Sequence, residues 1–163
     1  MPIFKIKSYA KINLALNIVG KSSKLHKIES IVSFIELHDL IYLEFINTKN
    51  HKVSFHGKFS KGIEKKNTIT TLLRLLDKKK LLNNAKLKIR IIKNIPQEAG
   101  MGGGSMNAAS LINFLIFKRI IKLKKNALIN LTKLVGSDVI LGIDPKNSIL
   151  SSNGLIKKYK KKN

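Results

Sequence analysis

Four glycines fall within five positions in the stretch Pro96-Gln97-Glu98-Ala99-Gly100-Met101-Gly102-Gly103-Gly104-Ser105-Met106-Asn107-Ala108-Ala109. The alternating pattern of Lys86 to Lys93 before it predicts a strand, and the apolar periodicity from Ser105 to about Ile121 predicts a helix. The N–H groups of a helix's first turn are unpaired and lie at the positive end of the helix dipole, so they attract anions. The stretch therefore predicts a phosphate-binding loop between a strand and a helix.

The residues around this loop exclude two common nucleotide-binding motifs. No Gly-Lys-Ser/Thr follows the glycines, as a Walker loop requires. The segment Ile95 to Ala99 is too long for the tight first turn of a dinucleotide-binding fold, and no acidic residue stands about 20 positions later. A flexible strand-to-helix turn is the structural alternative, but a tight turn needs only one or two glycines. We therefore favour a phosphate loop of another kind.

The pattern on either side of the loop predicts a two-layer α+β sandwich with helices on one face of a mainly antiparallel sheet. Residues 1–46 predict strands, because apolar and polar residues alternate there with the period of a half-buried strand. A helix is predicted at 68–80, with Asn67 as its N-cap. Strands first, then a strand interleaved with helices, are typical of this architecture. The other predicted elements are strands at 12–18, 28–37, 41–46 and 53–55, with His38-Asp39 as a polar break between two of them, and a helix at 126–135.

Length and composition indicate one globular domain. The chain has 163 residues, of which 44% are hydrophobic and 25% charged, as in an ordinary folded core. It has no cysteine, which excludes disulfide frameworks, zinc–cysteine sites and thiol nucleophiles, and its histidines have no spacing typical of a metal site. The apolar runs are short and carry lysines, and Met1 to Lys7 lacks the apolar segment of a signal peptide. We expect no membrane contact and a cytoplasmic location.

The net charge of +23, from 32 basic and 9 acidic residues, admits two interpretations. One is an anionic partner, because Lys and Arg contacts to phosphate dominate non-specific nucleic-acid affinity. The other is biased genome composition, because the lysines are scattered and accompany many Ile and Asn residues, which all have A/T-rich codons. Only three basic residues are arginine, and the few aromatic residues stand mostly at apolar-periodic positions rather than where bases would stack. We favour the bias, and keep a basic nucleic-acid-binding module as the alternative function.

Three ordered segments resemble the GHMP kinase superfamily, named for galactose, homoserine, mevalonate and phosphomevalonate kinases. Ala10-Lys11-Ile12-Asn13-Leu14 resembles the family's N-terminal strand, and Val135-Gly136-Ser137-Asp138-Val139 resembles its Gly-Ala/Ser-Asp-Val segment. Gly102-Gly103-Gly104-Ser105, with Asn107-Ala108-Ala109 after it, is similar to the family's phosphate loop. The resemblance covers nearly the whole chain, and it implies a GHMP N-terminal domain, whose fold is similar to that of a ribosomal protein.

The resemblance also implies an activity. It is that of an ATP- and Mg²⁺-dependent kinase acting on a small molecule, a cytidine diphosphate derivative of methylerythritol, at its 2-hydroxyl in the non-mevalonate isoprenoid route. On this basis, nucleic acid is expected to bind only by non-specific charge attraction.

The resemblance assigns roles to particular residues. Lys11 and Asp138 match the catalytic pair, in which the ammonium favours the ionised aspartate and stabilises developing negative charge. By the residues alone, Lys11 is a solvent-facing strand lysine and Asp138 a turn or capping aspartate. Asn13 is expected either to hydrogen-bond the substrate or to hold Lys11 in place. His26, which is kept where the family has a histidine, is expected to bind the pyrimidine edge of the substrate, although a lone loop histidine is more often merely solvated. The residues expected to bind ATP are Pro96, Gln97, Glu98, Ala99, Gly100, Met101, Gly102, Gly103, Gly104, Ser105 and Met106.

The chain departs from the family's pattern in several places. Leu25 stands where relatives have a tyrosine that stacks on cytosine, Met106 replaces the loop's second serine, and Ile140-Leu141-Gly142 follows the aspartate in place of Pro-Phe/Val-Phe. The chain also stops at Asn163, where the family continues into a second domain that closes the cleft. We therefore expect residues 1–163 to form the ATP-binding domain without the C-terminal one, with little or no turnover alone.

One geometric prediction tests the assignment of the catalytic pair. A hydroxyl must lie within hydrogen-bond reach of its base, with the transferred phosphate on its other side. Lys11 and Asp138, 127 positions apart (138 − 11), must therefore lie close together beside the glycine loop.

Overall fold

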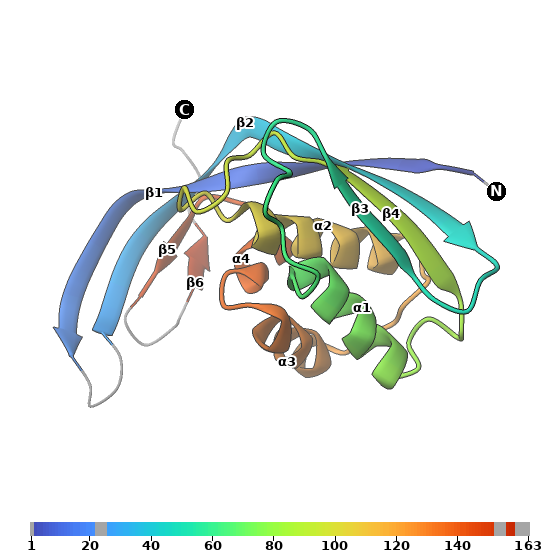
Figure 1. Ribbon diagram of the computed structural model, residues 1–163. Helices are drawn as coiled ribbons and strands as arrows, with labels where there is room; N and C mark the ends of the chain where they lie inside the picture. Colours follow the sequence, from blue (N-terminus) through green and yellow to red (C-terminus); the bar gives the residue numbers. More distant parts are fainter. Residues whose placement is uncertain (1, 22–25, 152–155, 159–163) are drawn as a thin grey trace.

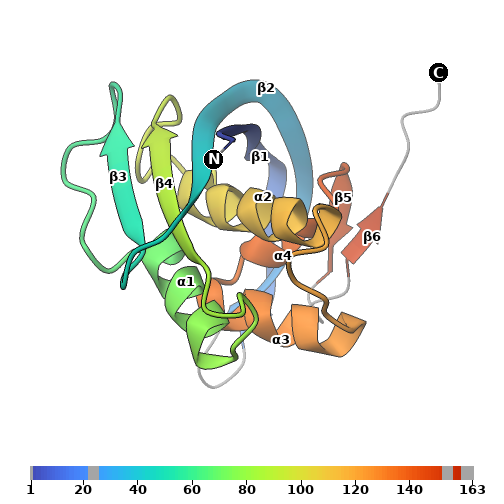
Figure 2. The ribbon, with the colours of Figure 1, turned by 90° about the vertical axis from the view of Figure 1, so that its right-hand side faces the viewer.

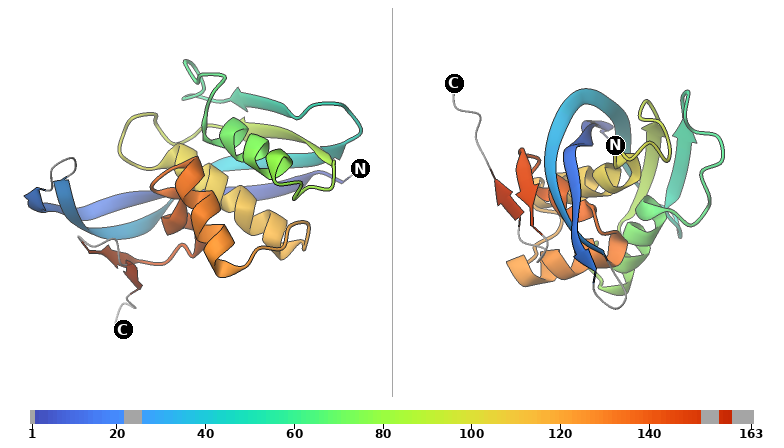
Figure 3. Two further views of the ribbon diagram at one scale, coloured as in Figure 1. Left: turned by 90° about the horizontal axis from the view of Figure 1, so that it is seen from below. Right: turned by 90° about the vertical axis from the view of Figure 1, so that its left-hand side faces the viewer.

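A six-stranded sheet forms one layer of the molecule and four helices form the other (Figure 1). The computed structural model describes residues 2–21, 26–151 and 156–158, and these counts refer to them; the side chains of residues 21 and 26–28 lie outside this description. The helices lie together on one side of the sheet, which curves around them (Figures 2 and 3). This arrangement confirms the predicted α+β sandwich.

The sheet is mainly antiparallel, as predicted. The strand order is β3-β4-β2-β5-β6, and β1 pairs with the other edge of β2. Every pairing is antiparallel except that of β3 with β4, which is parallel. The strands are β1 (Phe4–Lys21), β2 (His26–Ile46), β3 (Lys52–His56), β4 (Lys86–Ile92), β5 (Ser148–Leu150) and β6 (Ile156–Lys158).

The helices pack their apolar faces against the sheet and against one another. They are α1 (Thr68–Lys78), α2 (Gly103–Phe117), α3 (Lys125–Val135) and α4 (Val139–Ile143). The predicted N-cap of α1 is confirmed, because the Asn67 side chain accepts from the N–H groups of Ile69 and Thr70, both at 3.1 Å. The Thr70 hydroxyl in turn accepts from the backbone N–H of Asn67 at 3.0 Å. Burial of Ile69, Leu72, Leu73 and Leu76 then fixes this helix over the sheet.

The predicted break at His38-Asp39 is wrong, because β2 runs through it without interruption. Asp39 pairs with Ser8 in the β1–β2 ladder, and its side chain is fully buried. A buried carboxylate is stable in a strand only when donors surround it. Four donors do so here, and they are described with the site below.

The predicted end of the loop helix is also wrong, since α2 stops at Phe117 instead of continuing to about Ile121. The chain turns sharply at Arg119, which has a left-handed φ of 57°. Ile120 and Ile121 both donate their N–H groups to the Leu115 carbonyl, which closes this turn. Ile121 nevertheless stays buried in the core, which explains why the apolar pattern continues beyond the helix.

The β1–β2 hairpin reaches well beyond the helical layer (Figure 1). The alternation of 12–18 does form a strand, but Leu14, Leu16 and Ile18 are 59%, 57% and 67% exposed rather than half-buried. Within the described residues no helix lies beneath this end of the hairpin. None of the described helices is long and apolar enough to cross a bilayer.

Candidate active site

The glycine loop leads from β4 to α2, and its backbone geometry explains two of its glycines. Gly100 and Gly102 have φ values of 69° and 66°, in the left-handed region that other residues adopt only at a cost. Gly102 is the N-cap of α2 and carries no capping side chain, and within the described residues no side-chain cap is made to this helix start. The first-turn N–H groups are therefore free of side-chain partners and border an open cavity.

Two lysine side chains pack directly against consecutive glycines of the loop. A Cβ on Gly102 would lie 3.0 Å from Cγ of Lys11, and a Cβ on Gly103 would lie 3.1 Å from Nζ of Lys93. Glycine at these positions thus admits the chain's own cations to the helix start. Their positive charges add to the potential of the helix dipole at the same place.

Lys11 and Asp138 form an ion pair, with 3.3 Å between Nζ and Oδ2, which confirms that they lie together beside the loop. Lys11 is buried on β1, and its backbone N–H donates to the Met101 carbonyl at 3.1 Å, so the strand also holds the loop. Asp138 is the N-cap residue of α4, and its side chain is 39% exposed. The carboxylate is therefore fixed on one side by the lysine and open to the cavity on the other.

The cavity has a volume of about 640 Å³ and contains the loop and the ion pair on its walls. All of Pro96 to Ser105 lines it, as does Asn13, whose Oδ1 accepts from the Lys11 ammonium at 3.3 Å. Phe55 and Ile63 add apolar surface. The volume is within the range of small-molecule sites.

Not every predicted site residue lies there. The Met106 side chain is buried against Val32 and Leu141 and does not line the cavity, so its predicted contact with ATP is not supported. The backbone of His26 begins β2, but its side chain and all of Leu25 lie outside the described residues. The glycine at the departure after the aspartate has a packing role, since a Cβ on Gly142 would lie 2.6 Å from Cβ of Ala109 on α2.

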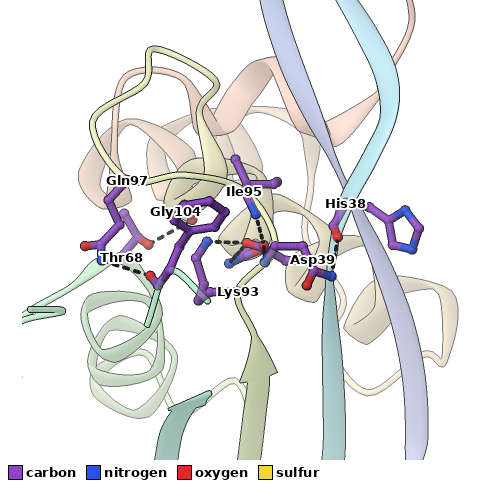
Figure 4. Close-up of polar contacts among 10 residues, drawn as sticks. His38, Asp39, Thr68, Lys93, Ile95, Gln97 and Gly104 are labelled. Atoms are coloured by element: carbon purple, nitrogen blue, oxygen red, sulfur yellow. Dashed lines mark hydrogen bonds and ion pairs between the residues drawn. The ribbon is translucent and has the colours of Figure 1, made fainter. Parts of the chain in front are cut away.

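The sequence interpretation missed a buried polar cluster at the base of the loop (Figure 4). Oδ1 of Asp39 accepts from the N–H groups of Asn94 at 2.7 Å and Ile95 at 2.9 Å. Oδ2 accepts from the Lys93 ammonium and from Nδ2 of Asn107 at 3.0 Å. The sequence signal that could have revealed this cluster was Asp39 itself, a single acidic residue between two apolar segments. From the alternating pattern alone, such a residue indicates an interruption of the strand.

One side chain of the loop and one of α1 make further hydrogen bonds that hold the loop in place (Figure 4). Nε2 of Gln97 donates to the carbonyls of Phe59 at 2.9 Å and Lys61 at 2.6 Å. The Thr68 hydroxyl, in the first turn of α1, donates to the Gly104 carbonyl at 2.8 Å. The loop is therefore held by β1, by β2 and by the segment that leads into α1.

A second cavity of about 640 Å³ lies between β3 and α1 and contains neither the loop nor the ion pair. On its wall Asp77 accepts from Lys86 at 2.8 Å and pairs with His51 at 3.1 Å. Partial burial raises the pKa of the Asp77 carboxyl, but these two partners outweigh it and hold the pKa below its usual value. The cluster ties α1 to β3 and β4, and it is structural in character.

Comparison with known families identifies the domain. Residues 67–144 match the model of the GHMP kinases N terminal domain. The chain contains a GHMP kinase N-terminal domain. The matched part of this GHMP domain runs from the N-cap of α1 to the end of α4, so it includes the glycine loop and Asp138.

Curated relatives of the GHMP domain carry the name 4-diphosphocytidyl-2-C-methyl-D-erythritol kinase. That of Pelagibacter ubique is 64% identical over 162 residues, which are 99% of this chain and 58% of the relative. That of Anaplasma marginale is 42% identical over 118 residues, which are 71% of this chain and 40% of the relative. The chain spans about half the length of the curated relatives it matches.

Solved structures share the fold of the GHMP domain. A crystal structure of 4-(cytidine 5'-diphospho)-2C-methyl-D-erythritol kinase matches with a TM-score of 0.73 at 20% identity, covering 96% of this chain and 55% of that one. Mevalonate pyrophosphate decarboxylase from Streptococcus pyogenes matches with a TM-score of 0.66 at 18% identity, covering 98% and 51%. At these identities the similarity establishes the fold alone.

Proposed function

We propose that the protein is the ATP-binding part of a kinase that phosphorylates the 2-hydroxyl of 4-diphosphocytidyl-2-C-methyl-D-erythritol in isoprenoid precursor biosynthesis. The observation that carries the proposal is the Lys11–Asp138 pair, 3.3 Å apart, on the wall of a cavity that the glycine loop also lines. The name and high identity of the Pelagibacter ubique relative support this substrate over those of other GHMP kinases.

In this proposal the loop binds the phosphates of ATP. The uncapped N–H groups at the start of α2 donate to phosphate oxygens, and Lys11 and Lys93 neutralise part of their charge. The apolar surface of Phe55 and Ile63 in the same cavity suits the flat base of the nucleotide. The γ-phosphate then lies toward Asp138.

Asp138 is proposed as the general base and Lys11 as the group that holds it. The exposed side of the carboxylate accepts the proton of the substrate hydroxyl while that oxygen forms a bond to the γ-phosphorus and the bond from phosphorus to the leaving oxygen of ADP breaks. Lys11 keeps the carboxylate ionised before the step and offsets negative charge on the oxygens during it. Asn13 orients the ammonium, and Asn13 and His26 are proposed to contact the substrate.

The donor set of the cavity fits a Mg²⁺ ion that arrives with the nucleotide. Among the described residues no three His, Asp or Glu side chains gather into a metal cluster. Ser105, Glu98 and Asp138 line the cavity, and Mg²⁺ is commonly bound by one or two such oxygens together with phosphates. When bound, Mg²⁺ would supply charge neutralisation at the phosphates; Ser105 and Glu98 are the residues proposed to hold it, which leaves Asp138 to act as the base.

Domain extent, partners and location complete the proposal. Residues 1–163 are proposed to be one N-terminal domain, with the remaining length of the relatives contributing the rest of the cleft and the exclusion of water. Nucleic acid is proposed to bind only through net charge, and so to dissociate as salt rises. The cytoplasm, which supplies ATP, is the proposed location.

The test is phosphate transfer by a chimeric chain in which residues 1–163 continue into the corresponding remainder of the Pelagibacter ubique relative. Offered labelled ATP with 4-diphosphocytidyl-2-C-methyl-D-erythritol, mevalonate, homoserine or galactose, it should label only the first, on its 2-hydroxyl. Preference for another alcohol would overturn the substrate. Failure to bind ATP would overturn the kinase proposal itself.

A further inference from the structure

The buried carboxylate of Asp39 holds both ends of the phosphate loop at once. On the side where the loop begins, it accepts from the backbone N–H groups of Asn94 and Ile95. On the side where the loop ends, it accepts from Nδ2 of Asn107, in the second turn of α2. Everything between Ile95 and Asn107 is the loop and the helix start, so one side chain sets the distance between its two anchors.

The same carboxylate also places a cation under the loop. Lys93 is only 4% exposed, its Nζ donates to Oδ2 of Asp39, and that Nζ lies where a Cβ of Gly103 would come within 3.1 Å. Without Asp39, the buried Lys93 ammonium would have no carboxylate to pair with. It would then reorient toward water or toward the loop. The position of a positive charge beside the phosphates thus depends on Asp39.

An apolar residue at position 39 could fill the same space but could not accept hydrogen bonds. Burial of an ion pair is by itself weak evidence for stability, because hydrophobic replacements are often as stable. Here, however, two of the four donors are backbone N–H groups of the segment that leads into the loop, and they are neutral. Only an acceptor at this position can pair them, and a carboxylate with both oxygens bonded fixes the peptide planes that carry them.

We propose that Asp39 is a positioning residue for nucleotide binding, which presets the phosphate loop by clamping its start, its end and Lys93. The inference rests on the proposed function, because it supposes that the loop receives the phosphates of ATP. Asp39 itself is fully buried and touches no reacting atom. Preorganisation of this kind raises affinity because the loop does not lose its freedom when the ligand binds.

The test compares Asp39→Asn with Asp77→Asn in the 163-residue chain. Both substitutions neutralise a carboxylate that pairs with a lysine, but Asp77 bridges α1 to β3 and β4, away from the loop. Two readouts are taken at a temperature where circular dichroism shows every variant folded: ATP affinity by calorimetry, and hydrogen exchange of the amides in residues 100–105. Asp39→Asn should weaken ATP binding by about tenfold or more and speed exchange in the loop, whereas Asp77→Asn should change neither.

Asn107→Ala keeps the test decisive if Asp39→Asn does not fold. It removes one donor, leaves the carboxylate with three, and places a good helix former in α2. It should loosen the loop and weaken ATP binding in the same direction, by a smaller factor.

The outcomes separate the inference from the proposed function. If Asp39→Asn and Asn107→Ala keep wild-type loop exchange and ATP affinity, the positioning role is overturned even where thermal stability falls. If the wild-type chain binds no ATP but both variants loosen the loop, the clamp stands and the proposed function fails.

Discussion

Lys11 makes two contacts that belong to different parts of the proposed reaction. Its backbone N–H holds the loop through Met101, whereas its ammonium pairs with Asp138. A side-chain substitution removes only the second contact. Binding of nucleotide and transfer of phosphate can therefore be separated most cleanly at the partner, Asp138, because the Lys11 ammonium is also proposed to neutralise phosphate charge.

In the chimeric chain, Asp138→Asn should lower the rate of phosphate transfer by about 10²–10⁴-fold while ATP affinity stays close to wild type, because asparagine has nearly the same shape but accepts no proton. Lys11→Ala should also lose transfer. Steady-state rates of the single and double variants check this. The double variant should cost much less than the product of the two single effects, as for residues that act as a unit; independent effects would contradict the pair.

Gly103→Val should abolish ATP binding with a loss of about 1–3 kcal/mol in the free energy of unfolding, because its side chain displaces Lys93 and Ile95 from the helix start. Gly100→Ala is the control. It adds strain at a φ of 69°, but nothing lies within 4 Å of its Cβ. Calorimetric titration with ATP should show that the control binds more tightly than Gly103→Val, and equal affinities would argue against close packing as the reason for the glycine.

At the residue scale, the sequence is sufficient for the loop and for the Lys11–Asp138 pair, because ordered motifs mark both. It is insufficient for Lys93, since lysine occurs in nearly every segment and only burial distinguishes this one. The role of Asp39 could not be predicted for a different reason. Its partners are two backbone N–H groups and side chains from distant segments, and no local sequence pattern indicates that they lie near it.

At the scale of the elements, the presence of the helices and strands could be predicted from periodicity and capping residues, but the positions where they end could not. β2 continues through His38-Asp39 because tertiary donors satisfy the acid, and α2 stops early because the chain turns at Arg119. Both are cases in which long-range packing overrides the local pattern. The short strands β5 and β6 lie where the apolar pattern is weakest, and pairing with β2 and with each other defines them.

The contact of α1 with β3 and β4 should carry an acid-dependent part of the stability. The pKa of Asp77 is held below its usual value, so the ionised carboxyl stabilises the fold above the unfolded pKa of about 4, and this is lost as pH falls through the folded value. Because about a third of the Asp77 side chain is exposed and water screens its pairs, Asp77→Asn should cost no more than about 1 kcal/mol at neutral pH. Denaturant unfolding from pH 7 downward should show the two proteins converge below about pH 4; a constant difference would contradict the assignment.

On the scale of the whole molecule, the β1–β2 hairpin carries several exposed apolar side chains close together in the described part of β1. We expect the chain to bind the dye ANS there, since Leu14, Leu16 and Ile18 are all more than half exposed. The double substitution Leu16→Gln and Ile18→Gln should reduce dye fluorescence and self-association, with each change shifting the free energy of unfolding by no more than about 0.5 kcal/mol. Dye titration and sedimentation check this, and a large loss of stability would mean that the hairpin is covered in solution.

The contacts of the Asp39 carboxylate also limit how early during synthesis the phosphate loop can take its final structure. Its partners at Lys93 and Asn107 stand 54 and 68 positions later in the chain. Contacts between such distant positions form late, because the entropy of closing long loops must be overcome first. A chain emerging from the ribosome therefore contains all the residues of its first hairpin long before it contains those of the phosphate loop. Nucleotide can stabilise the completed domain, but it has no loop to bind on a nascent chain that ends before the glycines.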